Sequence, residues 1–375
     1  MNHVPSSIRP IGAPVFSTGT QPDSSILAMT GMGMIASAKP YVDGQVQPAS
    51  LDLRLGTKAW RVRASFLPGG GATVMDRIAQ LGMFELDLTE GAVLETGCIY
   101  VAEIQERVAL PPELRGTVNP KSSTGRLDVF TRMVADRAVA YDTVVPGYSG
   151  PLYAEISPGT FPVVVREGSR LSQIRFRAGR CRLDDAETAA LHALDPLTDA
   201  PAPCFENGVA FSIDLKGFGP DRIVGYKAIP FAGAIDMDKA ASQPWQNFWE
   251  RIHVPTDDLL VLHPGAFYIF ASKESVSIPP DYAAEMVPFD PILGETRVHY
   301  AGFFDPSFGY LENGSIVSRG VLEVRCRDVP FAVVDGQVVG RLVYERMASR
   351  PERLYGSDLG SAYQGQSLKL AKHFY

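Results

Sequence analysis

The sequence of 375 residues is poor in the residues that bind metals or form disulfides. Its four cysteines are scattered without a Cys-x-x-Cys pair, and its six histidines never fall at metal-ligand spacing. It also lacks the His-x-Glu…Pro-Cys-x-x-Cys signature of zinc deaminases. We therefore expect no metal held by protein side chains, and the scattered thiols favour a reducing, cytoplasmic environment.

Long apolar runs and a surplus of positive charge are lacking as well. No run approaches the ~18 apolar residues that a membrane-spanning helix needs, and residues 1–7 lack the pattern of a signal peptide. The chain has 35 Lys and Arg against 42 Asp and Glu, which gives a net charge of −7. These absences argue against a membrane or a nucleic-acid polymer as partner, since either would favour a basic face.

Glycine and proline, in contrast, are plentiful, with 35 and 29 residues. Runs that are β-branched or alternate in polarity are short and end at Gly or Pro, as is typical of strands. The sequence therefore predicts a mainly β fold with a few short helices. We expect strands at 51–55, 99–104, 152–156, 163–165 and 171–176, and helices at 24–29, 74–81, 184–194 and 243–251.

A shift of 168 residues brings similar residues of the two halves of the chain into register. It aligns Gly97 with Gly265 and Glu155 with Glu323, among other pairs. Because Gly and Pro fix backbone geometry, their repetition indicates repeated turns and two copies of one β-rich module. The alternative is chance similarity between β-rich sequences.

A proline-rich segment at residues 195–203 separates the two copies and predicts a linker. The length of the chain allows two or three domains of ~150 residues each. We expect a first module with an N-terminal arm at residues 1–195, and a second module with a C-terminal tail at residues 205–375.

The richest polar cluster lies at residues 120–126, with a lysine, three hydroxyls, a glycine and an arginine. Hydroxyls and backbone N–H groups can surround the oxygens of an anion, while Lys121 and Arg126 supply positive charge. A solvated polar turn is the alternative interpretation.

Glu155 is a second candidate, because alternation along residues 152–156 places it on the same strand face as Tyr153. A carboxylate held rigidly in a strand suits proton transfer, although a solvent-facing glutamate would give the same pattern. The third candidate is the polar, Gly-rich tail at residues 355–369. It can serve as a lid over a ligand or simply be a frayed terminus.

Five segments, in chain order, resemble the dCTP deaminases, which share the trimeric dUTPase fold. They are residues 47–56, 121–126, 146–155, 167–176 and 363–366, and the resemblance covers about half of the chain. It implies two dUTPase-like distorted β-barrels (β-clip or jelly-roll-like) in tandem, the first of them catalytic. It also implies a homo-oligomer, with a homotrimer favoured.

The resemblance implies hydrolysis of dCTP to dUTP and ammonia without zinc, which supplies dUTP for thymidylate synthesis. Glu155 corresponds to the general base that takes a proton from the water attacking C4 of the cytosine ring. Ser122 and Arg126 correspond to residues that orient this water and stabilise charge on the ring. Mg²⁺ is implied only through the triphosphate oxygens that it bridges, and not through protein side chains.

Further positions match residues that bind the nucleotide in this family, so dCTP and dUTP are the expected ligands. Lys121, Ser123 and Gln173 correspond to residues that contact the triphosphate. Arg137 corresponds to an arginine near the base and phosphates, and Tyr148 to the aromatic residue of the sugar-binding turn. The tail residues that close over the ligand correspond to Tyr355, Tyr363, Gln366 and Lys369.

The sequence also departs from the family pattern. Val145 stands where an Asp usually precedes Pro-Gly, which argues against dUTP hydrolysis unless Asp142 substitutes for it. The second module keeps Glu323 but has no Ser-Ser-x-x-Arg motif at residues 287–297, where Asp290 and Glu295 would repel a triphosphate. We expect this module to be degenerate, to serve assembly and to deliver the tail.

Two alternative functions remain open. One is a dUTPase or a bifunctional dCTP deaminase and dUTP diphosphatase, and the other is a non-catalytic nucleotide-binding regulator on the same fold. The intact set of Ser122, Arg126 and Glu155 argues against the regulator.

Overall fold

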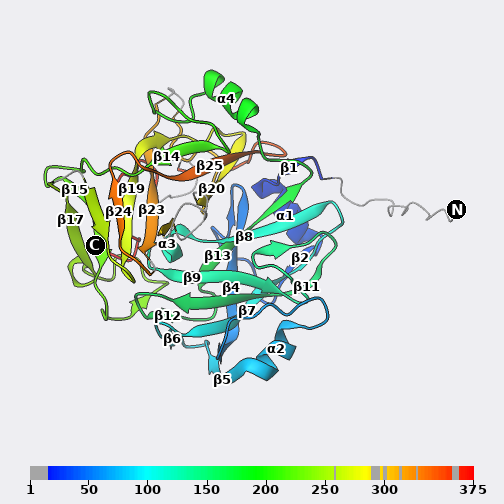
Figure 1. The fold of residues 1–375 in the computed structure, drawn as a ribbon. Coiled ribbons are helices and arrows are strands. Elements are labelled where there is room, and N and C mark those ends of the chain that lie inside the picture. The colour runs from blue at the N-terminus through cyan, green and yellow to red at the C-terminus, as the bar shows by residue number, and fades with distance from the viewer. Residues whose placement is uncertain are drawn as a thin grey trace.

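The computed structural model describes residues 16–256, 259–288, 296–298, 302–311, 315–326, 328–356 and 363–375 (Figure 1). Its strands form two barrel-like groups, so the predicted mainly β fold class is confirmed. The first group, blue to green, lies at the lower right of Figure 1, and the second, green through yellow to orange, lies at the upper left.

The first module is built on an 11-stranded sheet whose main path has the order β10-β8-β13-β4-β7-β11-β9. Its strands, with β6 and β12 of a small neighbouring sheet, are β1 (Gly19–Thr20), β2 (Ile35–Ser37), β3 (Val46–Gln47), β4 (Ser50–Val62), β5 (Gly82–Asp87), β6 (Ala92–Leu94), β7 (Ile99–Ala109), β8 (Leu114–Pro120), β9 (Val129–Ala135), β10 (Thr143–Val144), β11 (Ser149–Pro158), β12 (Val163–Val165) and β13 (Arg170–Ala178).

The second module has sheets of order β14-β25-β20-β22 and β17-β15-β19-β23-β21, with β18 paired to β24. Its strands are β14 (Val209–Ser212), β15 (Ile223–Ala228), β16 (Ile235–Asp236), β17 (Trp249–His253), β18 (Leu259–Leu262), β19 (Phe267–Val276), β20 (Tyr282–Pro288), β21 (Thr296–Val298), β22 (Phe303–Phe304), β23 (Ser318–Cys326), β24 (Phe331–Val334) and β25 (Val338–Arg346).

The strands of the second module follow those of the first at the offset found in the sequence. β20 and β25 have the bounds of β8 and β13 shifted by 168 residues. Gly97 and Gly265 lie in equivalent turns, with φ of 70° and 73°, where glycine carries no Cβ penalty. The tandem duplication predicted from repeated Gly and Pro is therefore confirmed.

The α-helices of the described residues are short, and three of them lie where the sequence predicts helices. Two of these, α2 and α4, begin with a capping box. In this arrangement the side chain of the N-cap residue accepts from the backbone N–H three residues later, and the side chain of that later residue accepts from the N-cap backbone N–H. The four helices are α1 (Asp23–Gly31), α2 (Val74–Leu81), α3 (Ser122–Gly125) and α4 (Asp185–Leu194).

The helix predicted at residues 243–251 is wrong. The segment forms a short 3₁₀ turn at Trp245–Asn247 and then strand β17, which pairs with β15. Trp249 is buried against Phe161 and Phe267, at ring-centroid distances of 5.5 and 6.0 Å. Apolar spacing over so few residues does not distinguish a helix from a strand that is packed on a core.

The apolar core of the first module continues into the second module. Phe248 and Trp249 belong to the same buried cluster as Phe161 and the strands of the first barrel. Next to this contact, β16 of the second module pairs in parallel with β12 of the first. The two modules therefore share both a core and a sheet.

Buried ion pairs connect β13 of the first module to β20 and β25 of the second. The Arg177 guanidinium donates to Glu345 (2.9 Å) and to Glu285 (3.1 Å), and fully buried Arg175 donates to the carbonyl oxygen of Ala284 (3.0 Å). Burial acts to raise the pKa of Glu345, but Arg177 and Arg175 outweigh burial and hold this pKa below its usual range.

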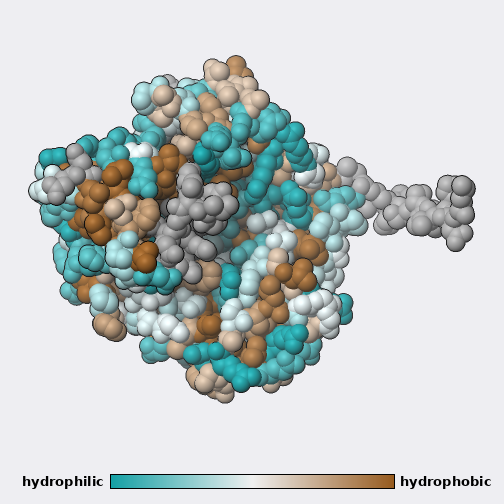
Figure 2. Space-filling model, viewed as in Figure 1, coloured by the Kyte–Doolittle hydropathy of each residue, from teal (hydrophilic) through white to brown (hydrophobic). Residues whose placement is uncertain are grey.

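On the face shown in Figure 2, apolar residues form patches among polar ones, and one patch covers strands of the second module at the left. Exposed apolar side chains in this module include Leu259, Val261 and Val334 on the β18–β24 pair, which are 42–46% exposed. Among the residues that the structure describes, no helix is long and apolar enough to cross a membrane.

The substitution Glu345→Ala should lower the free energy of unfolding by about 3–5 kcal/mol, because it leaves Arg177 and Arg175 as buried charges without their main partner. Urea denaturation measures this change. The matched control is Asp221→Ala, which removes the exposed partner of Arg251 and should change stability little. A Glu345→Ala protein as stable as the wild type would contradict the role given to these ion pairs.

Candidate active site

The polar cluster at residues 120–126 forms the short helix α3 and its two ends, between β8 and β9. The backbone N–H of Lys121 and the hydroxyl of Thr124 both donate to the carbonyl oxygen of Leu171, which ties the cluster to β13. The ammonium of Lys121 pairs with Asp52, and Arg170 lies 3.4 Å from the same carboxylate. The cluster is therefore a fixed and charged corner of the first module, and not a loose solvated turn.

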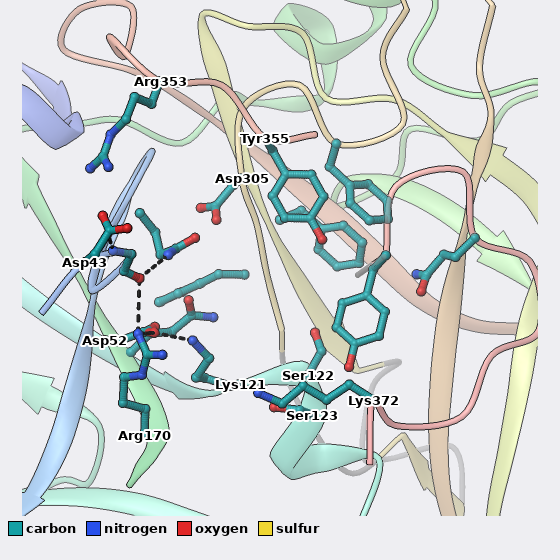
Figure 3. Close-up of a pocket in the computed structure, with 18 residues that line it drawn as sticks. Asp43, Asp52, Lys121, Ser122, Ser123, Arg170, Asp305, Arg353, Tyr355 and Lys372 are labelled. Carbon is teal, nitrogen blue, oxygen red and sulfur yellow. Dashed lines mark hydrogen bonds and ion pairs between the residues drawn. The ribbon is translucent and has the colours of Figure 1, made fainter. Parts of the chain in front are cut away.

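A pocket of about 540 Å³ opens at this corner, between the two modules (Figure 3). This volume is within the range typical of small-molecule sites. The first module contributes Asp43, Gly44, Gln47, Asp52, Lys121, Ser122, Ser123, Arg170 and Gln173, and the second contributes Phe303, Phe304, Asp305, Phe308, Arg353, Tyr355, Tyr363, Gln366 and Lys372.

The two sides of the pocket differ in chemistry. The side from the first module carries Lys121, Arg170 and the hydroxyls of Ser122 and Ser123, which suit phosphate oxygens. The opposite wall is aromatic: the ring of Phe308 lies 5.0 Å from that of Phe304 and 5.6 Å from that of Tyr355. An anionic ligand with a flat ring would match both sides.

The C-terminal tail closes one side of the pocket and contacts Arg126. The Arg126 guanidinium donates to the side chain of Gln366 (2.9 Å) and to the carbonyl oxygen of Lys369 (3.1 Å), and it lies 4.1 Å from the ring centre of Tyr363. The tail is also joined to β23, because the Arg319 N–H donates to the Gln366 carbonyl oxygen (2.9 Å). The tail therefore links α3 of the first module to a strand of the second.

Most of the nucleotide-binding residues predicted from the sequence meet in this pocket or against it. Arg126 and Lys369 do not line the pocket, but they reach it through the tail contacts. Those that line the pocket are Lys121, Ser122, Ser123, Gln173, Tyr355, Tyr363 and Gln366.

Glu155 lies elsewhere, in a polar cluster within the first module. Its carboxylate accepts hydrogen bonds from Arg132, Ser65 (2.7 Å) and Tyr141 (3.3 Å), and it is 4% exposed. Asp142 is close to this cluster and accepts from a backbone N–H of β9, and burial raises its pKa to about 7. The structure does not bring Glu155 together with Ser122 or Arg126 within one chain.

Arg137 and Tyr148 also lie outside the pocket. Arg137 is exposed and has a left-handed backbone, with φ of 61°. The Tyr148 hydroxyl donates to the carbonyl oxygen of Pro151 (2.6 Å), and burial raises the pKa of this phenol to about 12. The base and sugar contacts assigned to these two residues, like the role of Glu155, stay predictions.

Two acidic residues of the second module lie at the site without a role predicted from the sequence: Asp305, which was not singled out, and Glu323, which was expected only as a remnant of the repeat. Asp305 lines the pocket, and burial raises its pKa against the opposing effect of Arg175. Glu323 on β23 is buried beside Arg126, at 3.9 Å between Arg126 Nε and Glu323 Oε1. The sequence contains a signal for Asp305. The family pattern has an Asp before the proline of this turn, which is Val145 in the first module and Asp305 in the second. Asp290 and Glu295, expected to repel a triphosphate, lie outside the described residues.

No group of three or more His, Cys, Asp or Glu in the described part of the chain is arranged to hold a metal ion. The four cysteines are free thiols.

The fold and the pocket define a protein of two linked β-barrel modules with a small-molecule site between them. Two family models match it: the N-terminal domain of 2'-deoxycytidine 5'-triphosphate deaminase over residues 17–180, and the C-terminal domain over residues 184–374. The chain belongs to the dCTP deaminase family.

Individual relatives agree with this assignment. A dCTP deaminase of Halorubrum lacusprofundi is 35% identical over 158 residues, which are 41% of this chain and 74% of that protein. A dUMP-forming dCTP deaminase of Beutenbergia cavernae is 33% identical over 134 residues, which are 35% of this chain and 65% of that protein. The crystal structure of 2'-deoxycytidine 5'-triphosphate deaminase from Agrobacterium tumefaciens matches with a TM-score of 0.88 at 51% identity, covering 92% of this chain and 100% of that chain.

The substitution Gln366→Ala should loosen the tail, because Gln366 joins Arg126 to the backbone of Arg319. We expect faster amide hydrogen exchange over residues 365–370 than in the wild type, measured by mass spectrometry. The control is Ser367→Ala at the next, exposed position. Equal exchange rates in both variants would contradict the anchoring role of Gln366.

Proposed function

We propose that this protein hydrolyses dCTP to dUTP and ammonia in the pocket between the two modules. The observation that carries the proposal is the pairing, across one pocket, of the Lys121–Ser123 corner with an aromatic wall of the second module. A triphosphate fits the charged side, and a pyrimidine ring fits the aromatic side. Membership of the dCTP deaminase family supports the same substrate.

The phosphate contacts come from side chains that already point into the pocket. Lys121 and Arg170 share Asp52 in the structure, so that an incoming triphosphate competes with one carboxylate for both cations (Figure 3). Arg353 and Lys372 line the same pocket and add positive charge. We infer that Mg²⁺ enters with the nucleotide and bridges phosphate oxygens, as part of the substrate.

The proposed reaction needs a base, a positioned water and a stabilised ring. A glutamate carboxylate removes a proton from the water, the hydroxide oxygen bonds to C4, and that proton passes to ring N3. The glutamate then moves the remaining hydroxyl proton to the amino group, the C4–N bond breaks, and ammonia leaves with a carbonyl at C4. Ser122 orients the water, and Arg126 stabilises the developing charge from a buried position. In this proposal fixed donors and one carboxylate do the work that zinc does in other deaminases.

We infer that the protein is a homo-oligomer, with a homotrimer favoured, that acts in the cytoplasm. The exposed apolar side chains on the β18–β24 pair support self-association, and the four free thiols support a reducing compartment. Sedimentation velocity of the purified chain measures the oligomeric state.

A second candidate is a bifunctional enzyme that also converts dUTP to dUMP and pyrophosphate. Asp305 favours it, because this acid lines the pocket although the first module has lost the corresponding residue at Val145. In the family pattern an acid at this point contacts the sugar and activates water. We consider a purely regulatory role less well supported, since the chain belongs to a deaminase family and keeps Ser122 and Arg126 of the catalytic motif at the pocket.

Incubation of the purified protein with dCTP and Mg²⁺, followed by chromatography, tests both functions. Release of dUTP and ammonia is the expected result, and dUMP with pyrophosphate would favour the bifunctional candidate. Nucleotide binding without any turnover would instead support the regulator.

The substitution Lys121→Ala should weaken dCTP binding by about 10–100-fold, because a charge-assisted contact to phosphate is lost. Titration calorimetry with Mg-dCTP measures the affinity. The control is Lys58→Ala, which removes an exposed lysine on β4 outside the pocket. If Lys121→Ala binds as tightly as the control, the triphosphate lies elsewhere.

A further inference from the structure

The geometry points to Glu323 of the second module as the general base, and to one composite active site in each chain. In this site the first module supplies the phosphate-binding half and the second supplies the half that holds the pyrimidine. The assignment rests on the proposed deamination of dCTP, and it gives Glu323 the role that resemblance gives to Glu155.

Glu323 is the glutamate that lies beside Arg126, the last residue of the polar cluster at residues 120–126. The Nε atom of Arg126 is buried, has no hydrogen-bond partner among the described residues, and lies 3.9 Å from Oε1 of Glu323. Both side chains are nearly fully buried, at 3% and 6% exposure. This separation is too long for a direct hydrogen bond, and it suits a bridging water or a polar substrate group.

The surroundings of Glu323 keep its carboxyl available for proton transfer. Burial raises its pKa to about 7, against the lowering effect of Arg126. A carboxyl that titrates near neutral pH accepts and returns a proton with little cost in either direction. β23 fixes its position, because Glu323 pairs with Ile269 of β19 in the middle of a sheet.

Glu155 occupies the same place in the repeat, but its carboxylate is fully engaged. Arg132 donates to one oxygen, while Ser65 and Tyr141 donate to the other. Arg132 also stacks on Tyr141, with its guanidinium 3.6 Å from the ring centre. These contacts occupy both carboxylate oxygens and hold the side chain inside the first module.

The sequence divides the family motifs between the modules in the same way. Asp305-Pro306-Ser307-Phe308 has the acid and the aromatic residue of the family turn, and both Asp305 and Phe308 line the pocket. Ser307 has φ of 74°, close to the 77° of Gly147 in the turn of the first module, so the two turns correspond. Conversely, residues 289–294, the counterpart of residues 121–126, contain no Lys, Ser or Arg.

The tail joins the two halves. Gln366 accepts from Arg126, and its amide donates to the carbonyl oxygen of Arg319, four residues before Glu323 on β23. Closure of the tail therefore holds the arginine of one module against the strand that carries the glutamate of the other.

The discriminating experiment compares E323Q with E155Q, since each replaces a carboxylate by an amide of the same shape. We expect kcat on dCTP to fall by about 10²–10⁴-fold in E323Q and by less than about tenfold in E155Q. Binding of Mg-dCTP, measured by calorimetry, should stay close to that of the wild type in E323Q, which separates lost chemistry from misfolding.

A loss of kcat in E155Q that equals or exceeds the loss in E323Q would overturn the assignment. Wild-type protein that binds dCTP without turnover would overturn the proposed function, and the assignment with it, so the two failures are distinguishable.

Mixed chains test whether the site lies within one chain. R126A and E323Q chains, co-expressed with different tags and purified together, should remain inactive, because every site then lacks one of its two residues. Recovery of activity in this mixture would show that Arg126 and Glu323 come from different chains, and would overturn the single-chain site. A monomeric protein, in which no mixed species forms, would support it.

Discussion

The arrangement of the molecule depends on the buried ion pairs between β13 and the second module. Arg175 is fully buried and reaches the backbone of Phe304 (3.2 Å) and the carboxylate of Asp305 (3.5 Å), while its guanidinium lies 4.1 Å from the ring centre of Phe303. These are residues of the pocket wall. Because a buried charge without a partner is costly, the position of this wall is coupled to the stability of the interface between the modules.

In the proposed site, the duplicated chain divides the parts that bind one nucleotide between its two copies. When identical modules form sites at their contacts, each module contributes one half of a site to one neighbour and the other half to the other neighbour. Each module must therefore keep both halves. Two unequal modules in one chain can keep one half each and still form a complete site. The corner at Lys121 and the wall at Asp305 fit this scheme, because each lacks a full counterpart in the other module.

Local features of the fold were predictable from the sequence, and long-range ones were not. Repeated glycines such as Gly97 and Gly265 mark turns of fixed geometry, and the capping residues of α4 define a helix start within four residues. The segment around Trp249 was predicted wrongly, because its apolar spacing suits either a helix or a strand until the core that covers it is known.

The candidate site follows the same division. Lys121, Ser122 and Ser123 are adjacent in sequence, so the motif that reveals one of them places all three. Which glutamate lies beside Arg126 depends instead on how the modules pack, and no local pattern contains that information. The pair Asp305-Pro306 was a readable signal for the pocket wall, because it has the acid that Val145-Pro146 lacks.

The two glutamates show how the surroundings decide the use of a side chain. Both lie in the middle of a strand at equivalent positions of the repeat, and both are 4% exposed. Glu155 has a cation and two hydroxyls as close partners, so a ligand would have to displace these contacts to reach its carboxylate. Glu323 faces a single arginine across a gap that excludes a direct hydrogen bond, and burial resists its charge. The Glu155 carboxylate therefore holds the first module together. The Glu323 carboxylate can exchange a proton with a water or substrate group that lies between it and Arg126.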